Sequence, residues 1–357
     1  MEKARVGIIG TGGISHAHMT GYKAIPDRVD VAAVCDIDEE KVKAYATKFN
    51  VPRWYTDYNE MLAKENLDAV SVTTWNAAHK GAAIAAMRAG ANVICEKPMA
   101  MNAVEAQEMY DVSKETGKVL QIGFVRRYGA DAAMLKKFID AGTLGDIYYA
   151  KATYLRRSGC PGGWFGDIRY SGGGPLIDLG VHVMDLVRYL AGCPKPVSAY
   201  GVTYNNLGPD RASGAKSNLG YESNQTKSKY EFNVEDFTSA MIRFDNGMTL
   251  TVEASFNLNI KQDRGDIELF GTKGGTKITD GAEFFTDMNG EFINITPASK
   301  SVFEFTPSFN AEIAHFIDCV QNGVPCRAPA EDGVILMKMI DAIYESARTG
   351  HEALITY

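Results

Sequence analysis

Residues 4–15 read Ala-Arg-Val-Gly-Ile-Ile-Gly-Thr-Gly-Gly-Ile-Ser, an apolar strand that passes through a glycine-rich turn into a helix. Gly10 permits the tight turn, and Gly12 lets the backbone approach a pyrophosphate. The helix that begins here offers free N–H groups and the positive end of its dipole, both of which bind phosphate. Ser15 stands where a third glycine is usual and is small enough for close helix packing. The turn predicts a dinucleotide-binding loop formed by Gly10, Gly12, Gly13 and Ile14.

The first third of the chain continues this alternation of strand and helix. Short strands that are apolar throughout are typical of a parallel sheet covered on both faces, so we expect a doubly wound Rossmann domain over residues 1–123. The expected strands are Val6–Ile9, Val31–Cys35, Ala69–Thr73, Val93–Cys95 and Val119–Ile122. The expected helices are Ile14–Ile25, Glu39–Phe49, His79–Ala89 and Ala103–Thr116.

The pattern changes after Ile122 to long segments in which apolar and polar residues alternate. Such alternation favours a large, open, mostly antiparallel sheet with one buried face. We therefore expect an α+β domain with a mixed sheet over residues 124–357. Its expected strands are Ile147–Arg157, Val197–Tyr204, Val234–Phe244, Met248–Phe256 and Asp266–Phe270. Its expected helices are Ala130–Ala141, Asn310–Asn322 and Glu331–Arg348.

Residues 205–233 form a long polar segment rich in Gly, Ser, Asn and Lys. Loops of this length are usually functional or mobile. The segment is either a lid over a site or a solvated insertion, and the sequence does not choose between them.

The composition narrows the class of protein. The 357 residues carry a net charge of -7 without any run of Lys and Arg, so we do not expect a nucleic-acid partner. The chain starts in a strand without a secretory signal, and no apolar stretch approaches the roughly 18 residues that span a bilayer. The six cysteines lack the spacing of a metal site. We expect a cytoplasmic protein without membrane contact or bound metal.

Asp36 ends the second expected strand, where an acidic side chain can accept hydrogen bonds from the ribose hydroxyls of a dinucleotide. Its charge would repel a 2′-phosphate, and the next residue is Ile37 rather than Arg or Lys. This arrangement favours NAD over NADP as the cofactor. Asp36 and Glu39 also have the spacing of a helix capping box, which is a structural alternative compatible with ribose binding.

Polar residues follow the third strand at its carboxyl end. In a doubly wound sheet the ligand lies beyond these ends, so Thr74, Asn76 and His79 are expected near the cofactor. His79 can equally be a helix cap or a core contact.

Glu96, Lys97 and Pro98 follow the fourth strand at the same edge of the sheet. A lysine at this position would lie where the nicotinamide is expected and could polarise a substrate oxygen. The alternative is a surface lysine ahead of a turn proline.

Three glycines and Pro175 lead into an expected helix over Leu176–Leu190. At α-helical spacing Asp178, His182 and Asp185 share one face. An apolar stripe on this helix can bury and anchor it, formed by Leu179, Val183, Leu186 and Leu190. His182 can act as a base near neutral pH, oriented by Asp178. Alternatively, Asp178 complements the helix dipole and His182 is a half-buried structural residue.

These motifs resemble those of the Gfo/Idh/MocA family of oxidoreductases, along nearly the whole chain. The loop at Gly10, the Glu96-Lys97-Pro98 triplet, and Gly-Gly-Gly-x-x-x-Asp-x-Gly-x-His-x-x-Asp at residues 172–185 carry the likeness. The resemblance implies that His182 is the acid/base, that Lys97 orients the reacting oxygen and that Asp178 lines the same pocket. It also implies a cis Lys97–Pro98 bond, cofactor contacts by Glu96, Lys97 and Arg126, and a homo-oligomer, either a homotetramer or a homodimer.

The segment from Arg156 to Trp164, together with the long polar loop and Val234-Glu235-Asp236, is similar to members that act on glycosides at ring position 3. The expected function is NAD-dependent oxidation of a secondary ring hydroxyl on a sugar, glycoside or cyclitol. The expected substrate-binding residues are Lys97, Arg126, Trp164, Asp178 and His182. Two other functions stay open: an NAD-dependent glycoside-cleaving cycle of oxidation, elimination and reduction, and a non-catalytic NAD-binding regulator.

Overall fold

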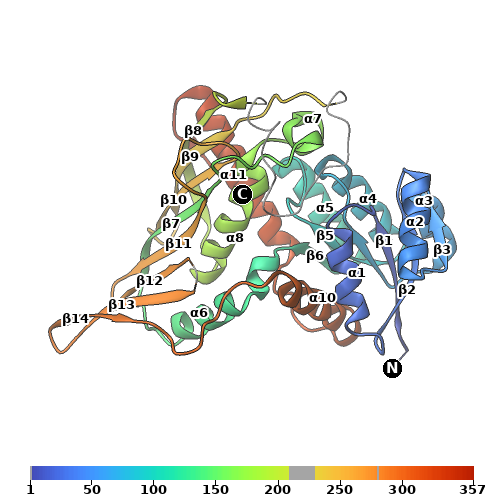
Figure 1. Cartoon of the computed structure of the whole chain (residues 1–357), viewed down its shortest axis with the longest axis horizontal. Helices are drawn as coiled ribbons and strands as arrows, with labels where there is room; N and C mark the ends of the chain where they lie inside the picture. The colour runs from blue at the N-terminus through green and yellow to red at the C-terminus, as the bar shows by residue number, and fades with distance from the viewer. Residues whose placement is uncertain (1, 209–229, 280) are drawn as a thin grey trace. The chain divides into compact units, whose positions relative to one another are not determined.

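The computed structural model describes residues 2–208, 230–279 and 281–357, which form two compact units (Figure 1). The first unit consists of Met1–Tyr128 and Glu304–Val334. The second consists of Gly129–Phe303 and Ile335–Tyr357. Most of the polar segment 205–233, namely residues 209–229, lies outside the described residues.

The first unit contains a six-stranded parallel sheet with the strand order β3-β2-β1-β4-β5-β6. This order reverses between β1 and β4, which is the mark of a doubly wound sheet, and it confirms the predicted Rossmann domain. The strands are β1 Ala4–Ile9, β2 Val29–Cys35, β3 Arg53–Tyr55, β4 Ala69–Val72, β5 Asn92–Glu96 and β6 Leu120–Gly123.

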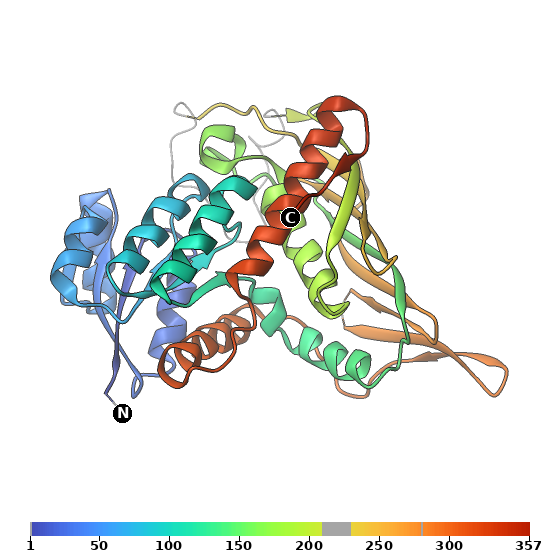
Figure 2. The same cartoon turned by 180° about the vertical axis from the view of Figure 1, so that it is seen from behind.

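Helices cover both faces of this sheet. On one face α1, α2 and α10 bury Met19, Tyr45 and Phe316 in a core with the strands. On the other face lie α3, α4 and α5, and Figure 2 shows α4 and α5 side by side. The helices are α1 Ser15–Lys23, α2 Glu39–Phe49, α3 Tyr58–Glu65, α4 Asn76–Arg88, α5 Ala103–Thr116 and α10 Phe305–Asn322.

Helix α10 belongs to the first unit although it follows the second unit's sheet in the sequence. Its Ile313, Phe316 and Ile317 are fully buried against α1 and the sheet. The fit is close enough that a Cβ atom on Gly21 would lie 2.8 Å from Ile313. The sequence places this helix within residues 124–357, and the domain ranges drawn from the sequence stay a prediction.

The second unit contains a nine-stranded mixed sheet with the order β14-β13-β12-β11-β7-β10-β9-β8-β15. The pairing of β7 with β10 is parallel, and the other pairings between described strands are antiparallel. The strands are β7 Ile147–Leu155, β8 Pro196–Tyr204, β9 Phe237–Phe244, β10 Thr249–Ser255, β11 Arg264–Gly271, β12 Gly275–Ile278, β13 Ala282–Met288, β14 Glu291–Ile295 and β15 Ala353–Leu354.

The two faces of this sheet differ in burial. Leu250, Ile242 and Ala152 alternate onto a buried face, against which the helices of the unit pack. Tyr200 and Met241 are register partners on the opposite face, and each is about half exposed. The sheet therefore has the one-sided burial that its alternating pattern predicts. The second unit's helices are α6 Ala130–Asp140, α7 Ile168–Ser171, α8 Val181–Leu190 and most of α11 Ala330–Thr349.

The segment predicted as a single helix over Leu176–Leu190 has two parts. Residues Leu176–Gly180 form a π-helix, η3, and α8 begins only at Val181. The apolar stripe is buried as predicted, because Leu179, Val183, Leu186 and Leu190 are at most 8% exposed. The assumption of uniform α-helical spacing from Asp178 onward is wrong, since a π-turn holds more residues than an α-turn.

Among the described residues, none of the helices combines the length and apolar character that a bilayer crossing requires.

Candidate functional site

The glycine loop after β1 is held between the ends of two neighbouring strands. Gly10 has a φ of +92°, and a Cβ atom there would lie 2.7 Å from the carbonyl oxygen of Thr73. The N–H of Gly10 donates to Cys35 O at 2.8 Å, and the Thr73 hydroxyl donates to Gly10 O at 2.6 Å. Both the dihedral angle and the close contact require glycine at position 10.

The next part of the loop leaves room for a ligand. A Cβ atom on Gly12 would meet nothing closer than Thr73 O at 4.0 Å. Ser15 is fully buried, and its hydroxyl donates to Gly12 O at 2.6 Å while Tyr45 donates to Ser15 O at 2.9 Å. Ser15 therefore fits at the position where the third glycine is usual. The loop leads directly into the N-terminus of α1, whose free N–H groups suit a pyrophosphate.

Asp36 follows β2 and is tied directly to this loop. Its Oδ2 accepts hydrogen bonds from Thr11 N at 2.7 Å, from the Thr11 hydroxyl at 2.9 Å and from Lys41 Nζ at 3.0 Å. Burial alone would raise the pKa of Asp36, but the backbone N–H groups of Thr11 and Asp38, together with the charge and hydrogen bond of Lys41, outweigh it and lower the pKa. Oδ1 accepts one bond among the described residues, from Asp38 N at 3.1 Å. A carboxylate oxygen offers two lone pairs, so Oδ1 retains capacity for a ribose hydroxyl.

The helix cap near this residue is different from the one expected. Helix α2 begins at Glu39, and its N-cap is Asp38, whose side chain accepts from Lys41 N at 3.1 Å. The capping-box reading of Asp36 is therefore wrong. Lys41 is a contributor that the sequence reading missed, because that reading considered only the residue directly after Asp36.

Residues after β4 lie at the same edge of the sheet. Thr74 is half-buried and Asn76 begins α4. His79 is buried, with Nδ1 2.8 Å from Pro98 O and Nε2 3.2 Å from Thr74 O. Burial lowers the pKa of His79, although both carbonyl oxygens act in the opposite direction. His79 thus connects the Thr74 and Pro98 loops, which supports the core-contact alternative.

A buried polar network lies beneath Lys97 and was not anticipated. His18 on α1 places Nε2 2.9 Å from Glu96 Oε1 and Nδ1 3.0 Å from Ser71 Oγ. Tyr22 contacts the same Ser71 hydroxyl at 2.7 Å. The other oxygen of Glu96 accepts from Lys97 N at 3.2 Å. The i, i+4 spacing of His18 and Tyr22 was a sign in the sequence that these two residues share a helix face.

Lys97 is half-buried, and its peptide bond with Pro98 is cis, as predicted. The two arginines after β6 differ in role. Arg126 is half-buried in the short helix η1, Val125–Tyr128. Arg127 is fully buried and donates to Asp332 at 2.8 Å and to Arg327 O at 2.6 Å. The buried arginine is structural, and the sequence reading had considered only Arg126.

In the second unit, Asp178 lies in the π-helix and His182 in the first turn of α8. Asp178 is 8% exposed, whereas His182 is half-buried. Trp164 lies in the short helix η2, Gly163–Gly166, and stacks on Phe165 with ring centroids 3.9 Å apart. A π-turn is frequent at functional sites because it re-aims side chains within an otherwise regular helix.

The start of the π-helix is held by Glu235, a residue singled out only as part of a triplet. Its carboxylate accepts from Gly174 N at 2.9 Å, Leu176 N at 3.3 Å and the Tyr344 hydroxyl at 2.8 Å. Part of the residue reaches solvent, but the carboxyl group is enclosed, and burial raises its pKa. A negative charge at a helix N-terminus also complements the helix dipole. Glu235 therefore fixes the segment that carries Asp178.

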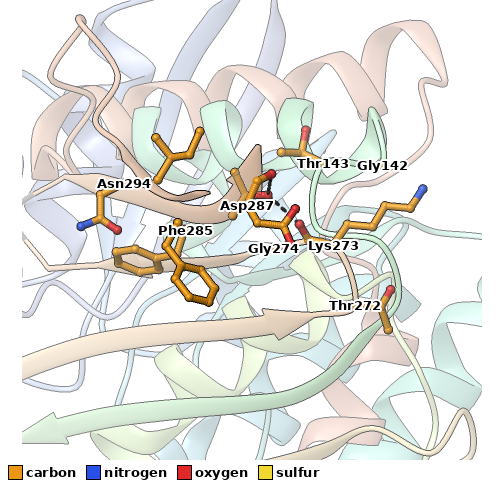
Figure 3. Close-up of a pocket in the computed structure, with 11 residues that line it drawn as sticks. Gly142, Thr143, Thr272, Lys273, Gly274, Phe285, Asp287 and Asn294 are labelled. Atoms are coloured by element: carbon orange, nitrogen blue, oxygen red, sulfur yellow. Dashed lines mark hydrogen bonds between the residues drawn. The ribbon is translucent and has the colours of Figure 1, made fainter. Parts of the chain in front are cut away.

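An open groove of about 910 Å³ lies elsewhere in the second unit (Figure 3). It is formed by the turn at Gly142, the turn at Lys273 and the β13–β14 hairpin. None of its described lining residues belongs to the predicted site.

Comparisons with known proteins match both parts of the chain. The oxidoreductase family model for Gfo/Idh/MocA, NAD-binding Rossmann fold, matches residues 4–124, and the Gfo/Idh/MocA C-terminal domain model matches residues 132–277. D-glucoside 3-dehydrogenase of Escherichia coli (strain K12) is 34% identical, over 97% of this chain and 96% of its own. The scyllo-inositol 2-dehydrogenase (NAD(+)) of Bacillus subtilis (strain 168) is 27% identical, over 98% and 95%.

A solved structure of levoglucosan dehydrogenase, in complex with NADH and L-sorbose, is similar along the whole length of both chains. Its TM-score is 0.86 and its sequence identity is 25%.

Proposed function

Because this chain belongs to the Gfo/Idh/MocA family, and its relatives include a D-glucoside 3-dehydrogenase and a scyllo-inositol 2-dehydrogenase (NAD(+)), we propose that it oxidises the 3-hydroxyl of a D-glucoside with NAD as the cofactor. The observation that carries this choice is the match to D-glucoside 3-dehydrogenase, at 34% identity over 97% of the chain. The presence of Lys97, Asp178 and His182 in this chain supports a dehydrogenase over a non-catalytic regulator.

The first unit supplies the cofactor contacts in this proposal. The pyrophosphate binds at Gly12 and the start of α1, and the adenosine ribose binds at Asp36. Glu96 and His79 act by holding the loops that carry Lys97 and Thr74, because their polar atoms bond to those loops. The residues proposed to bind NAD directly or in this way are Gly10, Gly12, Gly13, Ile14, Asp36, Thr74, Asn76, His79, Glu96, Lys97 and Arg126.

The chemical step requires removal of a proton and a hydride from the same CH–OH group. The nicotinamide of bound NAD supplies the hydride acceptor. We propose that His182 removes the hydroxyl proton, since an imidazole accepts a proton near neutral pH. Lys97 stabilises the negative charge that develops on the oxygen, and Asp178 orients the sugar and His182. Trp164 and Arg126 complete the proposed substrate site. The flat indole ring of Trp164 would pack against the apolar face of a sugar.

Substrate panels and two variants test the proposal. Methyl glucosides, levoglucosan and inositols are each incubated with NAD, NADH absorbance is followed, and the position of the new ketone is read by NMR. A 3-keto glucoside is expected. His182→Ala should lower turnover about 10²–10⁴-fold, the usual contribution of an acid/base residue, while the dissociation constant for NAD changes little. His351→Ala is the control, because His351 is exposed in the same unit.

Other outcomes contradict specific parts of the proposal. Cleavage of the glycoside without net NADH would favour the oxidation–elimination–reduction cycle. NAD binding without turnover on any substrate would favour a regulator. Near-full activity of His182→Ala would remove the assignment of the acid/base.

We also propose a homo-oligomer, either a tetramer or a dimer. One face of the nine-stranded sheet carries stacked aromatic pairs, Tyr149 with Phe270 and Tyr204 with Phe237. Tyr200 and Met241 on the same face are about half exposed. Contact with a second copy would bury this surface, since a one-sided sheet favours a covered apolar face.

A further inference from the structure

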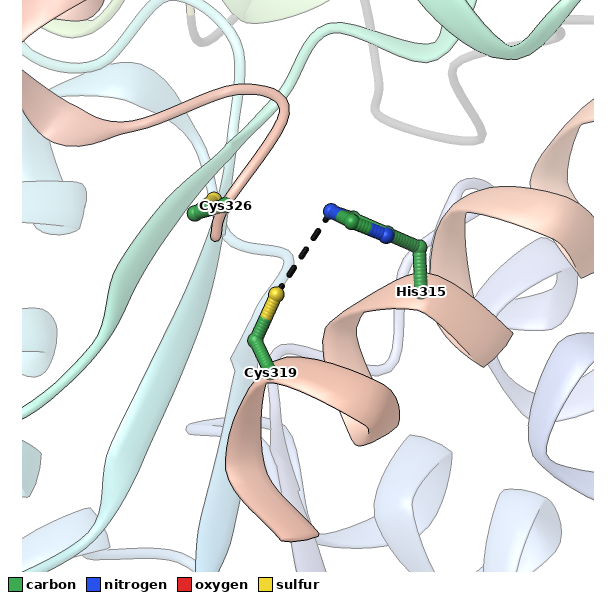
Figure 4. A group of neighbouring side chains, drawn as sticks. All are labelled: His315, Cys319 and Cys326. Carbon is green, nitrogen blue, oxygen red and sulfur yellow. Dashed lines mark hydrogen bonds between the residues drawn. The ribbon is translucent and has the colours of Figure 1, made fainter. Parts of the chain in front are cut away.

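Three side chains that bind soft metal ions converge at the end of α10, within the first unit. His315 and Cys319 lie one helical turn apart, and Cys326 follows in the loop before α11 (Figure 4). A ring nitrogen of His315 and both Sγ atoms all lie within 4.8 Å of one another. The spacing of these residues matches none of the usual zinc motifs, so no metal is expected here from the sequence. The loop between α10 and α11 folds back and brings Cys326 next to the end of α10.

The distances are close to those of a metal-bound cluster. Tetrahedral zinc with Zn–S near 2.3 Å and Zn–N near 2.0–2.1 Å implies N···S of about 3.6 Å and S···S of about 3.8 Å. Cys319 Sγ lies 3.5 Å from His315 Nε2. All ligand separations fall within 4.8 Å, so closing them around an ion needs side-chain shifts of about 1 Å.

The histidine already has its metal-binding tautomer. Arg327 N–H donates to His315 Nε2 at 3.0 Å, so in this structure the nitrogen carries no proton and its lone pair accepts the Arg327 bond. An ion would take this lone pair in place of the Arg327 bond. Neutral imidazole is the form that ligates metals.

The loop that carries Cys326 is fixed independently of any ion. Arg127 donates to Arg327 O at 2.6 Å, and Ile122 N donates to Ala328 O at 2.9 Å. Cys326 itself lies 3.5 Å from Gln121 Oε1, on strand β6. Cys319 is buried, whereas His315 and Cys326 are half-buried, which gives an ion a route from solvent. The three side chains therefore lie close together, with two of them reachable from solvent.

We propose that His315, Cys319 and Cys326 bind one thiophilic divalent cation, Zn²⁺ in the first instance, with a fourth position open to water. One nitrogen and two sulfur ligands with an open position form a known zinc ligand set. The ion would join the end of α10 to the loop that packs on β6. This site does not depend on the proposed dehydrogenase activity.

The test uses the full-length protein, reduced and freed of metal by chelation. Co²⁺ is titrated in, and thiolate-to-cobalt charge-transfer and visible ligand-field absorption are recorded. One equivalent of Co²⁺ should produce both bands with the intensity of tetrahedral coordination, and Zn²⁺ should displace it. In the unmodified protein, Zn²⁺ should also protect Cys319 and Cys326 from alkylation, as read by peptide mass spectrometry, while Cys193 stays as reactive as before.

Variants identify the ligands. Cys319→Ser and Cys326→Ser should each weaken Co²⁺ binding by at least ~100-fold, because even groups behind a metal ligand contribute 10–100-fold to affinity. Cys193→Ser is the matched control, since Cys193 is a half-buried cysteine of the second unit, and it should leave the titration unchanged. The alkylation measurement needs no variant, so a variant that fails to fold does not decide the result.

Absence of the charge-transfer band together with unprotected Cys319 and Cys326 would overturn the proposal. So would a band that survives both serine variants. The reduced protein could also bind no ion, while mild oxidation lowers its mass by two hydrogens at Cys319 and Cys326. That result would overturn the metal site and identify the two cysteines as a disulfide-forming pair.

Discussion

Gly174→Ala is expected to destabilise the second unit strongly, because the residue has no room for a side chain. A Cβ atom there would lie 2.1 Å from the carbonyl oxygen of Glu235. Ordinary van der Waals contact begins at 3.4 Å. The backbone would therefore have to move by about 1.3 Å to make room for the added Cβ atom. The closest atom belongs to the backbone, so a rotamer change of Glu235 cannot relieve the strain.

The magnitude follows from two contributions. Overpacking costs about 1–3 kcal/mol. The same displacement pulls Gly174 N from the Glu235 carboxylate, a 2.9 Å bond to a charged group worth about 1.5–3 kcal/mol. Together they predict a loss of roughly 2.5–6 kcal/mol in the free energy of unfolding. For a unit of this size, each kcal/mol lowers the melting temperature by roughly 2–4 °C, so a fall of about 10 °C is expected.

Urea unfolding and thermal melts followed by circular dichroism measure the effect. Gly265→Ala is the control, because Gly265 lies in the same sheet unit and a Cβ atom there meets nothing within 4 Å. Its stability should be unchanged or slightly raised. Turnover of Gly174→Ala should also fall by more than its unfolded fraction explains. The reason is that Asp178 N donates to Gly174 O at 3.1 Å, so a shift of Gly174 also displaces Asp178. A free energy of unfolding within about 1 kcal/mol of the unmodified protein would refute the reasoning.

Three further outcomes are expected. Gly10→Ala should weaken NAD binding at least about tenfold by calorimetry, since a strained positive φ costs 1–3 kcal/mol; unchanged affinity would separate the loop from the cofactor. Asp36→Asn should narrow the preference for NAD over NADP, and tighter binding of NADP by the unmodified protein would contradict this role. Because the pKa of Asp36 is lowered on folding, its contribution to stability is present above its ordinary value of 3.8 and is lost as the pH falls through the lowered value; acid unfolding should be correspondingly less steep in Asp36→Asn. Light scattering at micromolar concentration should give a mass above the 38.9 kDa of one chain, and a monomer mass would count against the covered sheet face.

The sequence predicts the main strands and helices well because their apolar patterns are regular. Helices α2 and α5 have the expected bounds, and the five expected Rossmann strands are all present. The sequence analysis missed β3 and α3. Strand β3 has only three residues, none of which is buried, so it carries no apolar pattern. It also missed the β13–β14 hairpin. Phe292 in β14 is almost fully exposed, so this strand lacks the one-sided alternation that marks a buried face.

The candidate site is predictable only where its residues are neighbours in sequence. The Gly10 loop and the Glu96-Lys97-Pro98 triplet are local motifs with a known strand–turn context. The His18–Glu96 contact joins residues 78 positions apart, and Glu235 reaches Gly174 across 61 positions. No local pattern encodes such pairs, because they exist only once the chain has folded. The π-turn at Asp178 was missed for a related reason, since a helix period is read as α by default.

Helix α10 has a consequence for the order in which the chain can fold during synthesis. The ribosome releases residues 1–128 long before residues 304–334, yet both segments form one core. Until α10 emerges, the groove that receives Ile313, Phe316 and Ile317 exposes Met19 and Tyr22 to water. The nascent first unit is therefore an incomplete, aggregation-prone body while the second unit's sheet is being made. Translation to about Val334 completes it, so a fragment that stops at residue 123 is expected to require either α10 supplied separately or a chaperone to remain in solution.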